Sequence, residues 1–203
     1  MTEPQEESPL ATIALPTAEA TQALAAGLAT VLLPGDLIIL VGELGAGKTT
    51  FTQGLGLGLG VKGRIASPTF VLSRVHSSST GGPDLVHVDA YRLGSAAEVT
   101  DLDLEESMDR SVTVVEWGRD RAEDLAQSRL EIELIRPVGD AATGVSGGSD
   151  GPAPWEAEDL EDDAVERSLR LWAIGPRWEG EARAALLRAV GHEQPHRGAA
   201  DAE

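Results

Sequence analysis

Apolar residues recur along the chain in segments whose spacing predicts helices and buried strands. Residues 17–33 carry apolar side chains near helical spacing behind Thr17, whose hydroxyl is typical of a helix N-cap. After a Pro-Gly-Asp turn, residues 37–41 are apolar without interruption, as expected of a strand that is buried on both faces of a parallel sheet. The first two elements are therefore predicted to be a helix and a central strand.

A second helix is expected after Lys48, although its composition is unusual. Residues 54–60 read GLGLGLG, and each glycine inside a helix costs up to about 1 kcal/mol relative to alanine. The alternation alone would suggest a strand, and the glycines are expected to loosen a helix. We predict a helix that ends near Leu59, because the glycine-rich loop before it is a useful anion site only at a helix N-terminus.

Downstream segments continue the succession of strands and helices. Residues 85–91 and 112–117 have the apolar character of strands, and residues 95–108 between them read as a helix. A strand, helix, strand order predicts parallel strands joined by crossovers. Three more elements are expected: strands at 129–137 and 167–175, and a helix at 179–190.

This pattern predicts a single α/β domain with a mixed, mainly parallel sheet flanked by helices. Its core is expected at residues 11–136, completed by a C-terminal strand and helix at 166–192. Residues 137–165 are rich in Gly, Ser, Ala and Pro and then carry a run of acids without a basic residue, which predicts a flexible acidic insertion. Residues 1–10 and 193–203 are expected to be disordered.

Composition narrows the class of function. The chain has no cysteine, which excludes disulfides, thiolate metal sites and cysteine nucleophiles. Its net charge of −18 argues against a wide basic face for nucleic acid, so any RNA is expected to be held by a partner. The acidic N-terminus and the interrupted apolar runs predict neither a secretory signal nor a membrane span, and a cytoplasmic location is expected.

Residues 42–49, GELGAGKT, match the phosphate-loop pattern G-x-x-x-x-G-K-[ST] without a gap. Glycines allow successive N–H groups to point at phosphate oxygens, Lys48 supplies a charge to the β- and γ-phosphates, and the Thr49 hydroxyl suits Mg²⁺. The alternative is an ordinary glycine turn, but a chance match has odds on the order of a few per thousand. Nucleotide binding is therefore predicted.

Two carboxylates follow the next apolar strands. Asp89 ends LVHVDAY and Glu116 ends VTVVEW, and the carboxyl ends of neighbouring parallel strands open into the same crevice as the phosphate loop. An acid there can hold a metal ion or orient a nucleophilic water, although either one alone could simply make a turn or an ion pair. His87 is as compatible with a packed core as with a site.

The tetrapeptide SPTF, residues 67–70, lies where a switch segment could sense the γ-phosphate. Thr69 could contact metal or phosphate there, and a simple turn ended by Pro68 before a strand is an equally good interpretation.

Several nucleotide-dependent classes can be excluded. The chain has no asparagine and so lacks the guanine-reading motif of Ras-like GTPases, it has no LSGGQ-like element, and it is too short for a two-lobed helicase. A small ATPase, a small-molecule kinase and a nucleotide-gated binding module remain. A kinase would use Asp89 as a base and would need an arginine-bearing lid, for which residues 119–129, read as a surface helix, are the candidate.

The motifs GELGAGKTTF, SPTF, HVDAYRL and VEW, in this order and at these distances, resemble the TsaE (YjeE) family, the ATPase component of bacterial tRNA threonylcarbamoyladenosine synthesis. The resemblance covers about residues 10–136, with weaker similarity at 166–190. It implies a P-loop nucleoside triphosphate hydrolase fold that binds ATP and Mg²⁺. It also implies slow, partner-stimulated hydrolysis that resets a heterodimer of TsaD- and TsaB-like proteins. Threonylcarbamoylation of adenosine 37 in tRNAs reading ANN codons would then depend on this chain, with tRNA contacted only indirectly.

The resemblance also assigns roles by position. Thr49 and Glu116 would ligate Mg²⁺, and Asp89 would serve the metal or the attacking water, so that Asp89, Glu116 and Lys48 are the catalytic group. Thr69 would belong to a switch-like loop. Trp117 would lie beside the nucleotide, unless it is a core tryptophan. The nucleotide would be bound by Leu44, Gly45, Ala46, Gly47, Lys48, Thr49 and Thr50.

Three features depart from the family pattern, the first being the alternating glycines after the phosphate loop. Residues 77–84 are expected to lengthen a hairpin-like connection, and the acidic insertion lies outside the family core. Trp155, Trp172 and Trp178 are expected to pack in the C-terminal region without chemistry.

Overall fold

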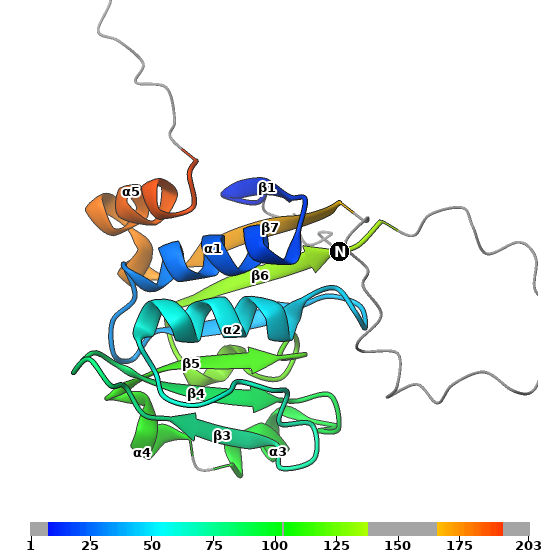
Figure 1. The fold of residues 1–203 in the computed structure, drawn as a ribbon. Coiled ribbons are helices and arrows are strands. Elements are labelled where there is room, and N and C mark those ends of the chain that lie inside the picture. The colour runs from blue at the N-terminus through cyan, green and yellow to red at the C-terminus, as the bar shows by residue number, and fades with distance from the viewer. Residues whose placement is uncertain (1–7, 103, 138–165, 193–203) are drawn as a thin grey trace, which may run out of the picture.

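A seven-stranded sheet with the order β1-β7-β6-β2-β5-β4-β3 forms the centre of the computed structural model, which describes residues 8–102, 104–137 and 166–192 (Figure 1). The predicted disordered ends and the acidic insertion lie outside the described residues, apart from residues 8–10 and 137. The strands are β1 (Ala11–Leu15), β2 (Leu37–Val41), β3 (Ser73–His76), β4 (Asp84–Asp89), β5 (Ser111–Glu116), β6 (Arg129–Ile135) and β7 (Arg167–Ile174).

The strand directions confirm a mixed, mainly parallel sheet. Strand β2 pairs in parallel with β5 and β6, and β4 pairs in parallel with β5. The pairs β6–β7, β7–β1 and β3–β4 are antiparallel. Strands β1, β6, β2, β5 and β4 therefore share one direction, while β7 and β3 run against it.

Helices cover both faces of the sheet, as predicted for an α/β domain. They are α1 (Ala18–Ala29), α2 (Lys48–Leu59), α3 (Ala96–Thr100), α4 (Glu105–Met108) and α5 (Gly180–Ala189), with short 3-10 turns η1 (Glu123–Leu125) and η3 (Pro176–Trp178). Thr17 caps α1 as predicted, because its hydroxyl accepts a hydrogen bond from the Ala20 amide at 3.1 Å. No helix in the described part of the chain is long and apolar enough to cross a bilayer.

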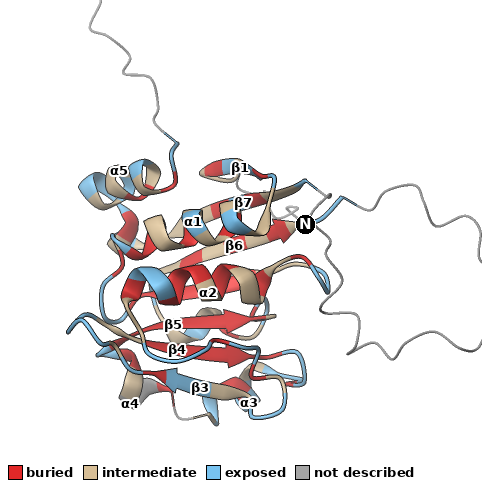
Figure 2. Cartoon of the chain, viewed as in Figure 1, coloured by how far each residue is buried: buried red, intermediate tan, exposed pale blue. Residues whose placement is uncertain are grey.

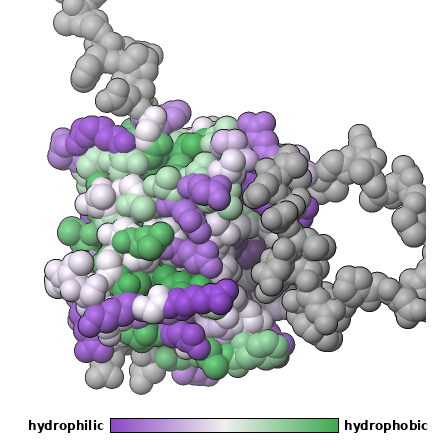
Figure 3. All heavy atoms as spheres, viewed as in Figure 1, coloured by the Kyte–Doolittle hydropathy of each residue, from purple (hydrophilic) through white to green (hydrophobic). Residues whose placement is uncertain are grey.

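Two apolar clusters pack against opposite faces of the sheet, and the central strand β2 contributes to both. Ile38 and Leu40 belong to the cluster under α1, α2 and α5, whereas Leu37 and Ile39 belong to the cluster under α3 and α4. All four side chains are buried, which confirms the uninterrupted apolar run as a central strand. The neighbouring strands β5 and β4 are also mostly buried (Figure 2). On the outer surface over α1 and α2, hydrophilic and hydrophobic residues are interspersed (Figure 3).

The glycines of α2 allow close packing of α1 against α2, and the helix is continuous to Leu59 as predicted. A Cβ atom at Gly58 would lie 2.6 Å from the Ala26 carbonyl oxygen, and one at Gly54 would overlap the Gln22 carbonyl oxygen. The glycines therefore do not loosen this helix, contrary to the expectation. Gly54 and Gly58 bring α1 and α2 together along their backbones, whereas Gly56 faces Ile65.

Replacing Gly54 with alanine is expected to lower the free energy of unfolding by about 2 kcal/mol, although alanine is the better helix former by about 1 kcal/mol. The added methyl would meet the main chain of Gln22, which cannot rotate away as a side chain could. Urea unfolding measures the loss. Gly82→Ala is the control, because its Cβ would have no atom closer than 3.7 Å. Equal stability of the Gly54 variant and the wild type would contradict this packing.

Two predicted helices differ in the structure. Residues 95–108 form two short helices, because Val99, Leu104 and Met108 all enter the same apolar cluster at spacings of five and four residues, which one helix cannot align. The predicted surface helix at 119–129 is wrong: Asp120 has a φ of 63°, which ends any right-handed helix, and only η1 forms.

The edge strand β1 was not predicted, and the strand expected after the SPTF turn had no predicted bounds; it is β3. Residues 77–83 join β3 to β4 as a hairpin connection, as expected. In the C-terminal region Trp178 is buried in the cluster under α1, Trp172 lies on β7, and Trp155 is outside the described residues.

Candidate functional site

The phosphate-loop sequence connects β2 to α2, at the edge of the sheet where β4, β5 and β6 also end (Figure 1). Gly47 is the N-cap of α2 with a φ of 101°, a left-handed conformation that strains other residues. No side chain caps this helix. The loop therefore leads directly into an open helix N-terminus, as the motif predicts.

Main-chain amides of this loop remain available to a ligand. The Ala46 amide donates to the Glu43 carbonyl and the Phe51 amide to the Gly47 carbonyl. The amides of Leu44, Gly45 and residues 47–50 meet no acceptor among the residues that the structure describes. Unpaired amides at a helix N-terminus attract anions, so the loop fits a phosphate group.

Lys48 lies inside the loop rather than in solvent. Its ammonium group donates to the carbonyl oxygens of Gly42 at 2.7 Å and Glu43 at 3.0 Å, and its nitrogen lies 3.8 Å from the centroid of the Trp117 ring. Burial lowers the pKa of Lys48, while the charges of Glu116 and then Asp89 oppose that effect. The ammonium group is thus held by two loop carbonyls beside the Trp117 ring, and the two acids stabilise its charge.

The two strand-end carboxylates lie side by side, as predicted. The parallel register of β4 and β5 pairs Asp89 with Glu116, and both are buried, at 3% and 2% exposure. The Thr49 hydroxyl donates to Glu116 Oε1 at 3.3 Å and lies 3.5 Å from Oε2. The loop hydroxyl and the two acids therefore come from α2, β4 and β5 to one place.

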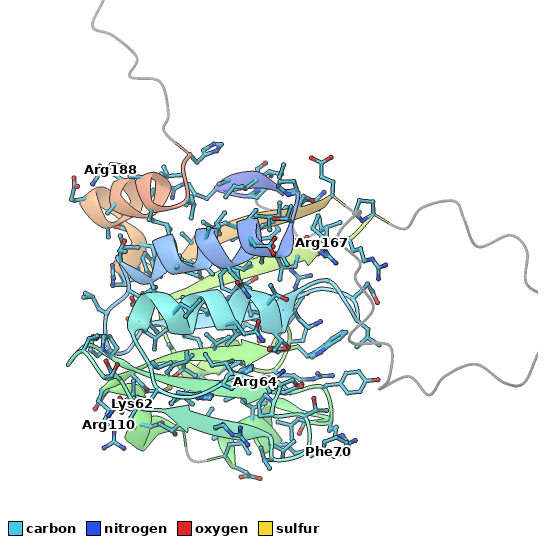
Figure 4. The ribbon with its side chains drawn as sticks, viewed as in Figure 1. Lys62, Arg64, Phe70, Arg110, Arg167 and Arg188 are labelled. Atoms are coloured by element: carbon cyan, nitrogen blue, oxygen red, sulfur yellow. The ribbon has the colours of Figure 1, made fainter. Side chains whose placement is uncertain are left out.

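Asp89 is tied to the predicted switch-like segment. Its Oδ2 accepts hydrogen bonds from the hydroxyls of Thr69 at 2.7 Å and Ser67 at 2.8 Å, and its Oδ1 accepts one from the Tyr91 amide at 3.0 Å. Phe70, which follows Thr69 in the chain, is 85% exposed and points away from the core (Figure 4). The segment thus links the carboxylate to the protein surface.

Trp117 lies at the site and not in the core. It has a φ of 61°, its amide donates to the Leu40 carbonyl at 2.9 Å, and its ring is half-buried between Lys48 and Tyr91. Such left-handed conformations in large residues concentrate at functional sites. The ring forms a wall beside the ammonium group.

The oxygen donors of the site suit Mg²⁺. Thr49, Glu116 and Asp89 offer a hydroxyl and two carboxylates, and the described residues contain no group of three or more His, Cys, Asp or Glu side chains that could hold a metal ion by itself. Mg²⁺ commonly takes one or two carboxylates and completes its shell with water and substrate phosphates. The arrangement therefore fits a metal ion that arrives with a nucleotide.

The remaining predicted nucleotide contacts occupy the loop and the first turn of α2. Leu44 is exposed at 76%, Ala46 is fully buried, and Thr50 is half-buried. Ser67 was missed as a separate contact, although its spacing from Thr69 lets both hydroxyls reach one carboxylate. His87, left undecided by the sequence, contacts Glu116 with its Nε2 2.7 Å from Oε1.

The family model that matches this chain and two similar proteins all carry the same name, TsaE. The family model described as "Threonylcarbamoyl adenosine biosynthesis protein TsaE" matches residues 15–141. A Streptomyces coelicolor protein named tRNA threonylcarbamoyladenosine biosynthesis protein TsaE is 59% identical over 116 residues, covering 57% of this chain and 78% of that protein. The Mycobacterium tuberculosis protein of the same name is 44% identical over 132 residues, covering 62% of this chain and 79% of that protein.

A solved structure resembles the fold as well. The crystal structure of Bacillus subtilis YdiB aligns with a TM-score of 0.59 and 29% identity, and the alignment covers 88% of this chain and 94% of that one. The family match includes the loop, both carboxylates and the switch-like segment. On this combination of sequence and fold, the chain belongs to the TsaE family.

Proposed function

We propose that this chain binds ATP with Mg²⁺ and hydrolyses it as the ATPase of tRNA threonylcarbamoyladenosine synthesis in the cytoplasm. The observation that supports this most is that Thr49 of the phosphate loop contacts Glu116, that Asp89 pairs with Glu116, and that both carboxylates act on the charge of Lys48. The pathway in this proposal, tRNA threonylcarbamoyladenosine synthesis, is taken from the names of the TsaE relatives.

Each side chain has a distinct part in the proposed hydrolysis. The free amides of the loop and the ammonium group of Lys48 bind the β- and γ-phosphates and offset their charge. Thr49 and Glu116 would hold Mg²⁺, which when bound neutralises charge on the phosphate oxygens. Asp89 is held in place by Ser67 and Thr69, and it orients the attacking water.

The proposed hydrolysis is slow in the isolated chain. In segment 119–129, the candidate for the lid that a kinase would need, the arginines contact the protein itself: Arg119 lies 3.6 Å from Glu133, Arg121 donates to the carbonyls of Ala90 and Trp117, and Arg129 donates to Glu131 at 2.8 Å. These contacts favour an ATPase over a small-molecule kinase, and partner proteins would complete the site.

We propose TsaD- and TsaB-like proteins as those partners, with ATP turnover resetting their heterodimer after each cycle. The net charge of −18 supports an indirect relation to tRNA, because a polyanion is repelled by an acidic surface.

The proposal is tested with γ-labelled ATP, the purified chain, the partner heterodimer and a pool of small metabolites. Free phosphate should be released, faster with the partners present, and repeated modification of tRNA by the heterodimer should require this chain. Label that appears in a metabolite would instead establish a kinase. Absence of saturable Mg-ATP binding by folded protein would reject both.

A further inference from the structure

A buried histidine on the neighbouring strand contacts Glu116. His87 is in the middle of β4 and is fully buried, and its Nε2 lies 2.7 Å from Glu116 Oε1. Because β4 and β5 pair in parallel with His87 opposite Val114 and Asp89 opposite Glu116, the His87 and Glu116 side chains lie on the same face, two positions apart. An imidazole ring spans this offset and places its outer nitrogen on the carboxylate.

The direction of the hydrogen bond follows from the chemistry of the two groups. An ionised carboxylate can only accept, so Nε2 of His87 carries the proton and donates to Glu116. The other ring nitrogen, Nδ1, is buried and has no hydrogen-bond partner among the described residues. A buried unpaired nitrogen weakens a fold, and an apolar residue would avoid it in a strand that also buries Leu85, Val86 and Val88. The imidazole is therefore better explained by its contact with Glu116 than by packing.

We propose that His87 is a positioning residue that fixes the orientation of the Glu116 carboxylate toward the phosphate loop. Its hydrogen bond is made to Oε1, which also accepts from the Thr49 hydroxyl at 3.3 Å, whereas Oε2 has only that hydroxyl, at 3.5 Å, among the residues that the structure describes. Oε2 is therefore the oxygen of Glu116 with more free lone pairs for a metal ion beside Thr49. Loss of a group that hydrogen-bonds to a metal-binding carboxylate commonly lowers metal affinity by about 10- to 100-fold. This inference rests on the proposed function, since it gives Glu116 its part in holding Mg²⁺.

The test measures how Mg²⁺ changes the affinity for a non-hydrolysable ATP analogue, by calorimetric titration at a series of Mg²⁺ concentrations. His87→Leu should raise the Mg²⁺ concentration needed for tight binding by about tenfold or more, and should leave binding without Mg²⁺ unchanged. His87→Gln places an amide N–H close to the position of Nε2, so this variant should stay within about threefold of the wild type.

Two further variants separate positioning from packing. His87→Asn offers the same amide on a shorter side chain that cannot reach Glu116, and it should lose as much as the leucine variant. His76→Leu is the matched control. His76 on the adjacent strand β3 is also buried with an unpaired Nε2, and burial lowers its pKa, but it makes no hydrogen bond to Glu116. This control should show the Mg²⁺ dependence of the wild type.

The outcomes are distinct. A leucine variant that needs no more Mg²⁺ than the wild type overturns the inference, and so does a glutamine variant that is as impaired as the asparagine variant. The comparison of glutamine with asparagine decides the matter if the leucine variant does not fold. If the wild type itself fails to bind the analogue, the proposed function is rejected instead.

Discussion

Replacing Lys48 with alanine is expected to weaken Mg-ATP binding by about 100-fold or more, equivalent to roughly 2.8 kcal/mol. The ammonium group already lies within the loop, against the carbonyls of Gly42 and Glu43, so it needs little rearrangement to meet a phosphate. The loss should appear in a calorimetric titration with Mg-ATP, and the melting temperature should show that the variant is folded.

The chain offers a matched control for this variant, because it has only one other lysine. Lys62 is exposed and follows the C-terminal end of α2, whereas Lys48 begins that helix (Figure 4). Lys62→Ala removes the same charge from the molecule and should bind Mg-ATP like the wild type. Similar losses in both variants would mean that general electrostatic attraction, and not the loop, governs affinity.

Replacing Glu116 with alanine should have the second large effect: hydrolysis should fall by about 100-fold or more, while nucleotide binding is retained within about tenfold. The loop amides and Lys48 still hold the phosphates, but the carboxylate beside Thr49 is gone. Phosphate release is measured with the partner proteins present, and affinity is measured separately.

Glu181→Ala is a suitable control, since this acid is exposed on α5 and pairs only with Arg188 among the described residues. It should leave hydrolysis unchanged. If the Glu116 variant hydrolyses ATP at the wild-type rate with partners present, the role proposed for this carboxylate is wrong.

Most of the fold could be predicted from periodicity, and the exceptions have physical causes. Strand β2 is buried on both faces and therefore has an unmistakable apolar run. Strand β3 lies at the edge of the sheet, and its Arg74 and Val75 are exposed, so it carries little apolar signal. The break between α3 and α4 depends on how Val99, Leu104 and Met108 pack into one cluster. Such tertiary packing cannot be predicted from local helix propensity.

Some residues of the candidate site could be predicted from the sequence, and one contact could not. Lys48, Thr49, Asp89 and Glu116 could be located from the sequence because a motif and strand ends place them. The contact of His87 with Glu116 depends on the register between β4 and β5, and no single segment encodes that register.

The backbone contact between α1 and α2 has a mechanical consequence for nucleotide exchange. Gly54 and Gly58 fit against the main chain of α1, so α2 cannot slide or roll without steric overlap, and the loop at its N-terminus is anchored with it. Segment 67–70 is joined to the site through hydroxyl groups and ends in an exposed phenylalanine. If the chain turns over ATP as proposed, we expect any accompanying displacement on the side of segment 67–70, where hydroxyl groups connect the site to the surface, and not on the side of α2.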